Sequence, residues 1–246
     1  MDIASHIDAL RTDGERLADA AVEAGLDATV PHCPGWSVRD LVRHLSGVHR
    51  WAATNVTYGR ASQEQAAAAF DAPDDDELMA WFRSGHEALV RTLAEASPAL
   101  EAWSFLPAPS PLAFWARRQA HETAIHRGDA EAAAGIKPSH DASFAADGID
   151  ELLAGFMSRS GGRLTSDPGV RLVVAPIDVP RAWTMWIGPS ETRCDPRAEA
   201  ADATVRGSAG DLYEFLWNRL DRDAIEVDGD PAVLDLWRDH ANVRWG

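Results

Sequence analysis

The chain has 246 residues, which is comfortable for two domains, and its hydrophobic content of 46% is ordinary for a protein with a packed core. The formal net charge of -16 argues against nucleic acid as a partner, because phosphate backbones attract basic surfaces, and also against an anionic membrane surface. No run approaches the roughly 18 apolar residues that a membrane span needs, and the acidic N-terminal segment is unlike a signal peptide. We therefore expect a cytoplasmic protein with reduced cysteines.

Apolar residues recur at helical spacing in four stretches of the N-terminal half, which predicts four helices. These are residues 2–23, a segment that begins at Ser37, a segment from the acidic cluster at 74–77 to before Pro98, and residues 112–134. Ser37 and Asp40 have the spacing of a capping box, although Asp replaces the usual Glu. Residues 59–73 are polar and rich in alanine, so we expect a loop or a frayed turn there. Helices with ionisable residues aimed at the core predict a bundle with an internal site.

A metal-binding pattern lies in the fourth of these helices, within the segment WARRQAHETAIHR (115–127). Glu122 and His126 are four residues apart, so both point to the same side of a helix. On the second helix, His44 falls at the edge of the apolar stripe and faces inward or into a cleft. Two histidines and a glutamate hold a divalent metal and leave coordination positions open, which suits catalysis. Asp129 follows His126 by three residues and could orient it, or could be an ordinary residue of the C-terminal helical turn.

Each of these residues also has an ordinary structural interpretation. His44 could be a partly buried histidine bonded to a backbone carbonyl, and Glu122 with His126 could be a solvent-facing pair. Trp51 and Trp115 could line the site, although most of the tryptophans are expected in the core. The residues alone leave both interpretations open.

Cys33 lies in the turn CPGW (33–36) that precedes the second helix. It has no adjacent base in the sequence that would activate it as a nucleophile. We therefore expect a structural role for this thiol.

The pattern changes after Gly135, Pro138 and Ser139, which mark a boundary between a domain at 1–140 and a domain at 141–246. In the second half, β-branched and aromatic runs predict strands, and amphipathic segments predict helices. The expected strands are 170–175, 182–187, 203–206 and 225–227, and the expected helices are 143–158, 209–220 and 231–238. This half is therefore expected to be an α+β domain.

Two stretches of the N-terminal half resemble the mycothiol-dependent maleylpyruvate isomerase family: CPGWSVRDLVRHL (33–45) and ETAIHRGDA (122–130). Less specific matches, GSAGDLYEFLWNR (207–219) and IEVDGDPAVLDLW (225–237), extend the resemblance over nearly the whole chain. The resemblance implies a DinB-like four-helix bundle followed by a smaller α+β domain of the sterol-carrier type.

The same resemblance implies that His44, Glu122 and His126 bind a divalent metal, with zinc as the first choice and nickel, manganese or iron as alternatives. It also implies mycothiol as a thiol cofactor and an arginine of the second domain that assists catalysis, for which Arg219 is the candidate. A thiol bound to a divalent cation loses its proton, and the thiolate adds to an electrophile. The resemblance thus implies an isomerase or S-transferase that acts on a small electrophilic molecule.

Trp51 and Trp115 are the candidates for contacts with the thiol cofactor. Two other functions stay open: a non-catalytic protein that binds a metal and a small apolar ligand, and a metal-dependent hydrolase that uses a metal-bound water. We expect no nucleic-acid or membrane partner, and a monomer or homodimer.

Overall fold

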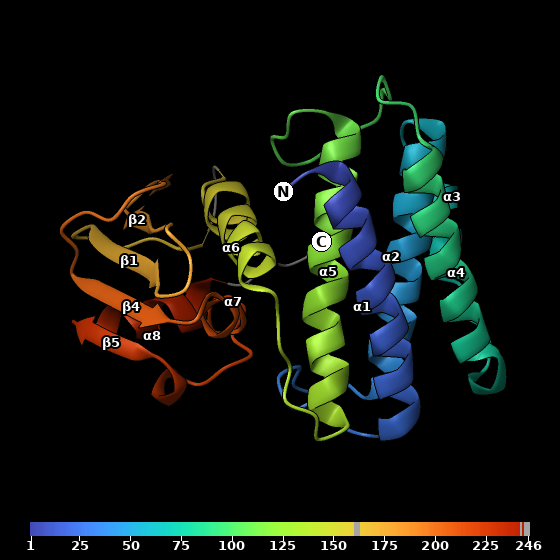
Figure 1. Cartoon of the computed structure of the whole chain (residues 1–246), viewed down its shortest axis with the longest axis horizontal. Helices are drawn as coiled ribbons and strands as arrows, with labels where there is room; N and C mark the ends of the chain where they lie inside the picture. The colour runs from blue at the N-terminus through green and yellow to red at the C-terminus, as the bar shows by residue number, and fades with distance from the viewer. Residues whose placement is uncertain (160–162, 242, 244–246) are drawn as a thin grey trace. The chain divides into compact units, whose positions relative to one another are not determined.

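The structure is a computed structural model that describes residues 1–159, 163–241 and 243 (Figure 1). The chain divides into two compact units, the first covering Met1–Ser139 and the second starting at His140. Among the described residues, no helix is long and apolar enough to cross a membrane. The two units differ in architecture, because the first is helical and the second contains a sheet. The expected helical bundle followed by a smaller α+β domain is therefore confirmed.

The first unit is a bundle of four long helices with one short helix between the second and the third. Its elements are α1 (Ile3–Ala24), α2 (Val38–Tyr58), α3 (Gln63–Ala69), α4 (Asp75–Glu95) and α5 (Pro111–Ala133). The most extensive packing joins α1 to α5 and α2 to α4 (Figure 1). The helix α3 lies in the stretch that was expected to be a loop or a frayed turn. It forms because Ser62 and Gln65 make a capping box that satisfies the free backbone donors at its start.

Local capping fixes where the helix that carries His44 begins. The Ser37 side chain accepts a hydrogen bond from the backbone of Asp40, and the Asp40 carboxylate accepts one from the backbone of Ser37. This reciprocal capping box is the one that the sequence predicts. Helix α2 ends at Tyr58 and is followed by the C-cap residue Gly59, whose φ of 78° is a conformation that glycine adopts without steric cost.

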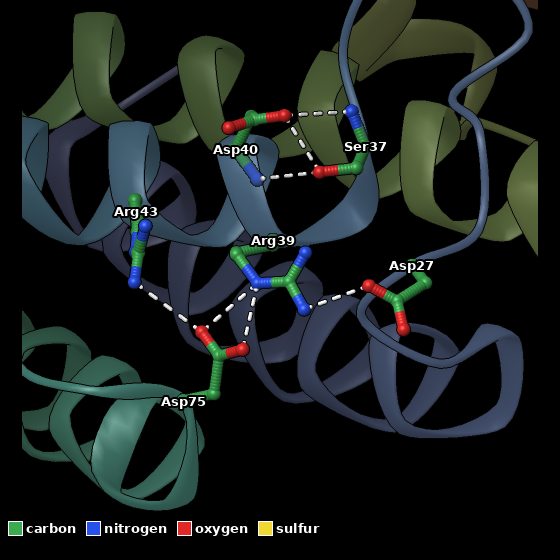
Figure 2. A network of polar contacts seen from close by, with 6 residues as sticks. All are labelled: Asp27, Ser37, Arg39, Asp40, Arg43 and Asp75. Carbon is green, nitrogen blue, oxygen red and sulfur yellow. Dashed lines mark hydrogen bonds and ion pairs between the residues drawn. The ribbon is translucent and has the colours of Figure 1, made fainter.

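Figure 2 shows a polar network that joins the starts of α2 and α4. The Arg39 side chain donates to Asp75 at 2.8 Å and to Asp27 at 2.7 Å, and Arg43 donates to Asp75 at 3.2 Å. Arg39 and Arg43 are partly exposed while they bridge these elements. Such exposed ion pairs contribute little free energy individually, but together they specify which helix ends lie side by side.

A buried ionic network ties α1 to α5 further along the bundle. The Arg127 side chain is 1% exposed and lies with its Nε 3.1 Å from Asp13 and its Nη1 2.6 Å from Glu131. Its other terminal nitrogen donates to the backbone carbonyl of Ser139 at 2.8 Å. Because both carboxylates are also largely buried, each charge in this network depends on the others for stabilisation.

The second unit packs helices with a mixed sheet. Its helical elements are α6 (Ala142–Asp150), the π-helix η1 (Glu151–Met157), α7 (Ala209–Leu216), the 3-10 helix η2 (Arg222–Ala224) and α8 (Ala232–His240). Its strands are β1 (Val170–Pro176), β2 (Trp183–Ile187), β3 (Thr192–Asp195), β4 (Ala203–Gly207) and β5 (Glu226–Gly229). In the described residues the sheet has the order β3-β2-β1-β4-β5. Strands β1 and β4 are parallel, and the other neighbours are antiparallel.

Two features of the second unit differ from the expectation. Strand β3, with the sequence TRCD, was not expected, because it is short and polar and owes its place to pairing with β2. Helix α7 ends at Leu216, before the expected end at 220. The chain turns there because Asn218 adopts a left-handed conformation with a φ of 60°.

Two buried histidines, His49 and His86, lie between the helices of the bundle with their ring centroids 5.4 Å apart. The Nε2 of His49 is 2.9 Å from the hydroxyl of Thr123, and the Nε2 of His86 is 3.2 Å from the backbone carbonyl of Arg11. Burial is the main cause that lowers the pKa of both rings, and His86 further disfavours a charge on His49.

The low pKa of His49 predicts that the bundle loses stability in acid. Above the unfolded-state pKa of about 6.5, neither state binds a proton at this ring. As the pH falls below that value, the unfolded chain takes up the proton first, so the free energy of unfolding decreases. We expect a smaller loss between pH 8 and pH 5 in His49→Gln than in the wild type, measured by urea unfolding of metal-free protein. Equal losses of unfolding free energy in the two proteins would contradict the assignment of this acid sensitivity to His49.

Candidate metal centre

Three side chains from two helices converge inside the first unit. His44 comes from α2, and Glu122 and His126 come from successive turns of α5. The Nε2 atoms of the two histidines lie 3.4 Å and 3.5 Å from Oε1 of Glu122. The three ligand atoms all lie within 4.8 Å of one another. The structure therefore brings together the three residues that helical spacing selects.

The cluster is buried on one side and reaches solvent on the other. The side chain of Glu122 is 6% exposed and that of His126 is 11% exposed, whereas that of His44 is 22% exposed. His44 is therefore the most exposed of the three side chains, and the two residues of α5 are the more deeply buried ones.

The second oxygen of Glu122 is held by a buried arginine of the same helix. The Arg118 side chain is 1% exposed and donates to Oε2 of Glu122 at 2.9 Å. Arg118 precedes Glu122 by four residues, so the helix itself sets this pairing. Because Oε2 is engaged, Oε1 is the oxygen that faces both histidines.

Electrostatics keep the glutamate ionised despite its burial. Burial opposes its charge, but hydrogen bonds from His126 and His44 and the positive charge of Arg118 outweigh it and hold the pKa of Glu122 well below its usual range. Burial likewise opposes a charge on His126, yet hydrogen bonds to Asp129 and Glu122 raise its pKa to about 9. The site thus favours positive charge next to Glu122.

The donor set fits a divalent metal ion. Two imidazole nitrogens and a carboxylate oxygen are ligands that zinc and other first-row divalent ions accept, and three protein ligands leave positions for water or substrate. The Nδ1 atom of His126 lies 2.9 Å from the Asp129 carboxylate, which leaves Nε2 to face the other two ligand atoms. The predicted ligands and their arrangement are therefore compatible with a catalytic rather than a purely structural site.

The structure adds a residue that the sequence interpretation missed, Trp36. Its ring lies nearly parallel to the ring of His126, with centroids 6.2 Å apart, and meets the ring of His44 edge-on at 5.1 Å. The signal available in the sequence was its position in the CPGW turn directly before Ser37, the residue that caps α2. Since the cap fixes the start of the helix, it also fixes this aromatic side chain against the cluster.

The two tryptophans chosen from the sequence lie together in an aromatic cluster. The rings of Trp51 and Trp115 are 5.2 Å apart, and Trp103 and Phe105 pack around them. Trp115 is fully buried and donates from its indole nitrogen to the backbone carbonyl of Trp103 at 2.9 Å. Their contact with a cofactor stays a prediction.

The predicted catalytic arginine and the second cysteine belong to the second unit. Arg219 follows α7 and donates to the backbone carbonyl of Trp217 at 2.7 Å. Its catalytic role stays a prediction. Cys194 lies in β3, where burial, followed by the charges of Asp150 and Asp195, raises the pKa of its thiol to about 12. A thiol with such a high pKa is a poor nucleophile at neutral pH.

Two solved structures resemble this chain over nearly its full length. One is described as a mycothiol-dependent maleylpyruvate isomerase, with a TM-score of 0.59 and 13% sequence identity. The other is a histidine-to-alanine mutant of a mycothiol-dependent maleylpyruvate isomerase, with a TM-score of 0.62 and 12% identity. Each match covers 93% of this chain and 93% of the other. At this level of identity the likeness establishes a shared fold.

Sequence comparison assigns both halves of the chain to one family. No curated protein sequence matches it significantly. The model of the mycothiol maleylpyruvate isomerase N-terminal domain matches residues 7–131, and the model of the C-terminal domain of the same isomerases matches residues 143–236. Together with the fold, these matches show that the chain belongs to the mycothiol-dependent maleylpyruvate isomerase family.

Proposed function

We propose that this protein is a divalent-metal- and mycothiol-dependent enzyme, an isomerase or S-transferase that acts on a small electrophilic molecule. The convergence of His44, Glu122 and His126 within 4.8 Å is the observation that carries the proposal. Membership of the isomerase family supports the thiol cofactor and favours isomerisation over conjugation.

When bound, a divalent metal and mycothiol would together supply a thiolate, whose reversible addition to a conjugated double bond allows the bond to rotate before the thiol is released. One carboxylate and two neutral imidazoles leave a divalent ion with net positive charge, which favours a thiolate and an anionic substrate. Zinc is the proposed metal, with nickel, manganese or iron as alternatives.

Residues of the chain would hold and enclose the reactants. Glu122 binds through Oε1, because Arg118 holds its other oxygen. Trp36 covers one side of the two histidine rings and limits water there. His44 is the most exposed of the three ligands, so the thiol and the substrate approach past it. Arg219 is the candidate that binds an anionic group of the substrate by paired hydrogen bonds.

Removal of the metal and omission of the thiol test the proposal together. We expect purified protein to contain stoichiometric metal and to isomerise maleylpyruvate, or to conjugate one of a panel of electrophiles, only when mycothiol is present. Chelation should abolish turnover, and added zinc should restore it. Turnover that needs the metal but no thiol would instead favour a hydrolase, and turnover that survives chelation would contradict the metal's role.

A further inference from the structure

A chain of hydrogen bonds lies behind His126, at the ring nitrogen that does not face Glu122. The Nδ1 atom of His126 is 2.9 Å from Oδ2 of Asp129. The thiol of Cys33 donates to the same carboxylate oxygen at 3.4 Å. Asp129 is completely buried, whereas Cys33 is partly buried in the loop before α2. One buried oxygen therefore links a candidate ligand on α5 to a thiol on a distant loop.

This arrangement bears on which nitrogen of His126 binds a metal. An imidazole ligand must offer a lone pair at one nitrogen, and a carboxylate that accepts a proton at the other nitrogen fixes both the tautomer and the ring orientation. In this site Asp129 engages Nδ1 and the Nε2 atom lies 3.5 Å from Oε1 of Glu122, so Nε2 is the nitrogen that would bind the metal, which would take the place of its proton.

The thiol of Cys33 acts on the orientation of the Asp129 carboxylate. The imidazole of His126 and the thiol of Cys33 both approach Oδ2 of Asp129, so together they restrain the orientation of this carboxylate. Cys33 lies three residues before Trp36, whose ring contacts both candidate histidine ligands. The bond from Cys33 to Asp129 therefore also attaches the turn that carries Trp36 to the helix that carries His126.

We propose that Asp129 is the positioning residue for His126, and that Cys33 is a hydrogen-bond donor that orients Asp129 and is no nucleophile. The inference rests on the metal site of the proposed function. It assigns a role to the cysteine of the CPGW turn, because a thiol that donates to a carboxylate must keep its proton.

Metal affinity measured by competition with a chromophoric chelator tests the proposal. Asp129→Asn should weaken binding about 10–100-fold, the loss typical of an outer partner of a ligand. Cys33→Ala should weaken binding by a smaller factor, and Cys33→Ser, which keeps a donor, should retain more affinity than Cys33→Ala. Because Cys33 acts through Asp129, the double variant Cys33→Ala with Asp129→Asn should bind no more weakly than Asp129→Asn alone.

Asp13→Asn is the matched control, since Asp13 is a largely buried carboxylate of the same bundle that pairs with Arg127. The visible spectrum of cobalt-substituted protein should change in Asp129→Asn and stay as in the wild type in Asp13→Asn. If both variants weaken metal binding equally, the effect is general loss of stability and the proposal is wrong.

Other results of these measurements would also support or overturn the roles of Asp129 and Cys33. Wild-type affinity in Asp129→Asn would overturn the role of Asp129 while leaving the metal site intact. A wild-type protein that binds no metal would overturn the proposed function and this inference with it. If Asp129→Asn fails to fold, the comparison of Cys33→Ser with Cys33→Ala decides: greater affinity in Cys33→Ser supports the hydrogen bond, and equal affinities contradict it.

Discussion

Replacing His44 and His126 together by alanine is expected to abolish stoichiometric metal binding while leaving the bundle folded. The two substitutions remove both imidazole ligands and leave Glu122 as the remaining donor of the cluster. A lone carboxylate holds a divalent ion far more weakly than three converging ligands, so the loss should exceed the about 10–100-fold effect of removing an outer partner. Elemental analysis after dialysis measures the metal, and circular dichroism checks the fold.

The matched control for this pair replaces two exposed histidines, His32 and His240, by alanine. The same chemical change is made at the same number of sites, so a general effect of histidine removal would appear in both proteins. We expect the control to keep its full metal content. Metal retained by the His44 and His126 variant would place the ion elsewhere in the protein.

Arg127→Met is expected to destabilise the first unit by about 3–5 kcal/mol, the usual consequence of removing one partner from a buried ionic network. The substitution removes the Arg127 cation from both Asp13 and Glu131, while Glu131 keeps its ion pair with the partly exposed Arg16. Methionine fills a similar volume, so the loss reflects charge rather than a cavity. Urea unfolding followed by circular dichroism measures the change.

Arg39→Met provides the comparison at an exposed position. Arg39 also bridges two acidic residues, Asp27 and Asp75, but water screens these pairs (Figure 2). We expect a much smaller shift of the unfolding midpoint than in Arg127→Met. Equal shifts in the two variants would show that burial does not set the strength of the Arg127 network.

The ligand set could be predicted from the sequence because helices make spacing informative. Glu122 and His126 share a face through their separation of four residues, and the position of His44 on its own helix directs it inward. The pairing of the two helices could not be obtained in this way, since periodicity says which face is buried but not which helix covers it. The family resemblance supplied that step, and the structure brings the three side chains together.

The supporting residues were harder to predict. Trp36 lies in a turn, where no periodicity indicates direction, and only the folded loop shows that it contacts both histidines. Asp129 was recognised from its spacing to His126, because both lie on one helix. The contribution of Cys33 depends on a contact that spans the loop and α5, which local sequence does not encode. Sequence patterns therefore do not reveal the side chains that support a site through long-range contacts.

Strand β3 was not predicted from the sequence for a related reason. The short strand β3 carries a polar sequence, and it forms because the edge of β2 offers backbone partners. By contrast, α3 was missed although its capping box at Ser62 is local. Its alanine-rich composition was interpreted as frayed, but a box of this kind is enough to start a short helix that then packs against α2.

The near-ultraviolet and visible absorption spectrum of the cobalt-substituted protein during a titration with mycothiol is the most direct test that this cluster binds a metal and activates a thiol. We expect a sulfur-to-cobalt charge-transfer band that grows to a stoichiometric end point, because the three ligands leave a coordination position for the thiolate. The band should be absent when His44 and His126 are replaced by alanine. A wild-type spectrum that stays unchanged at saturating mycothiol would contradict the account.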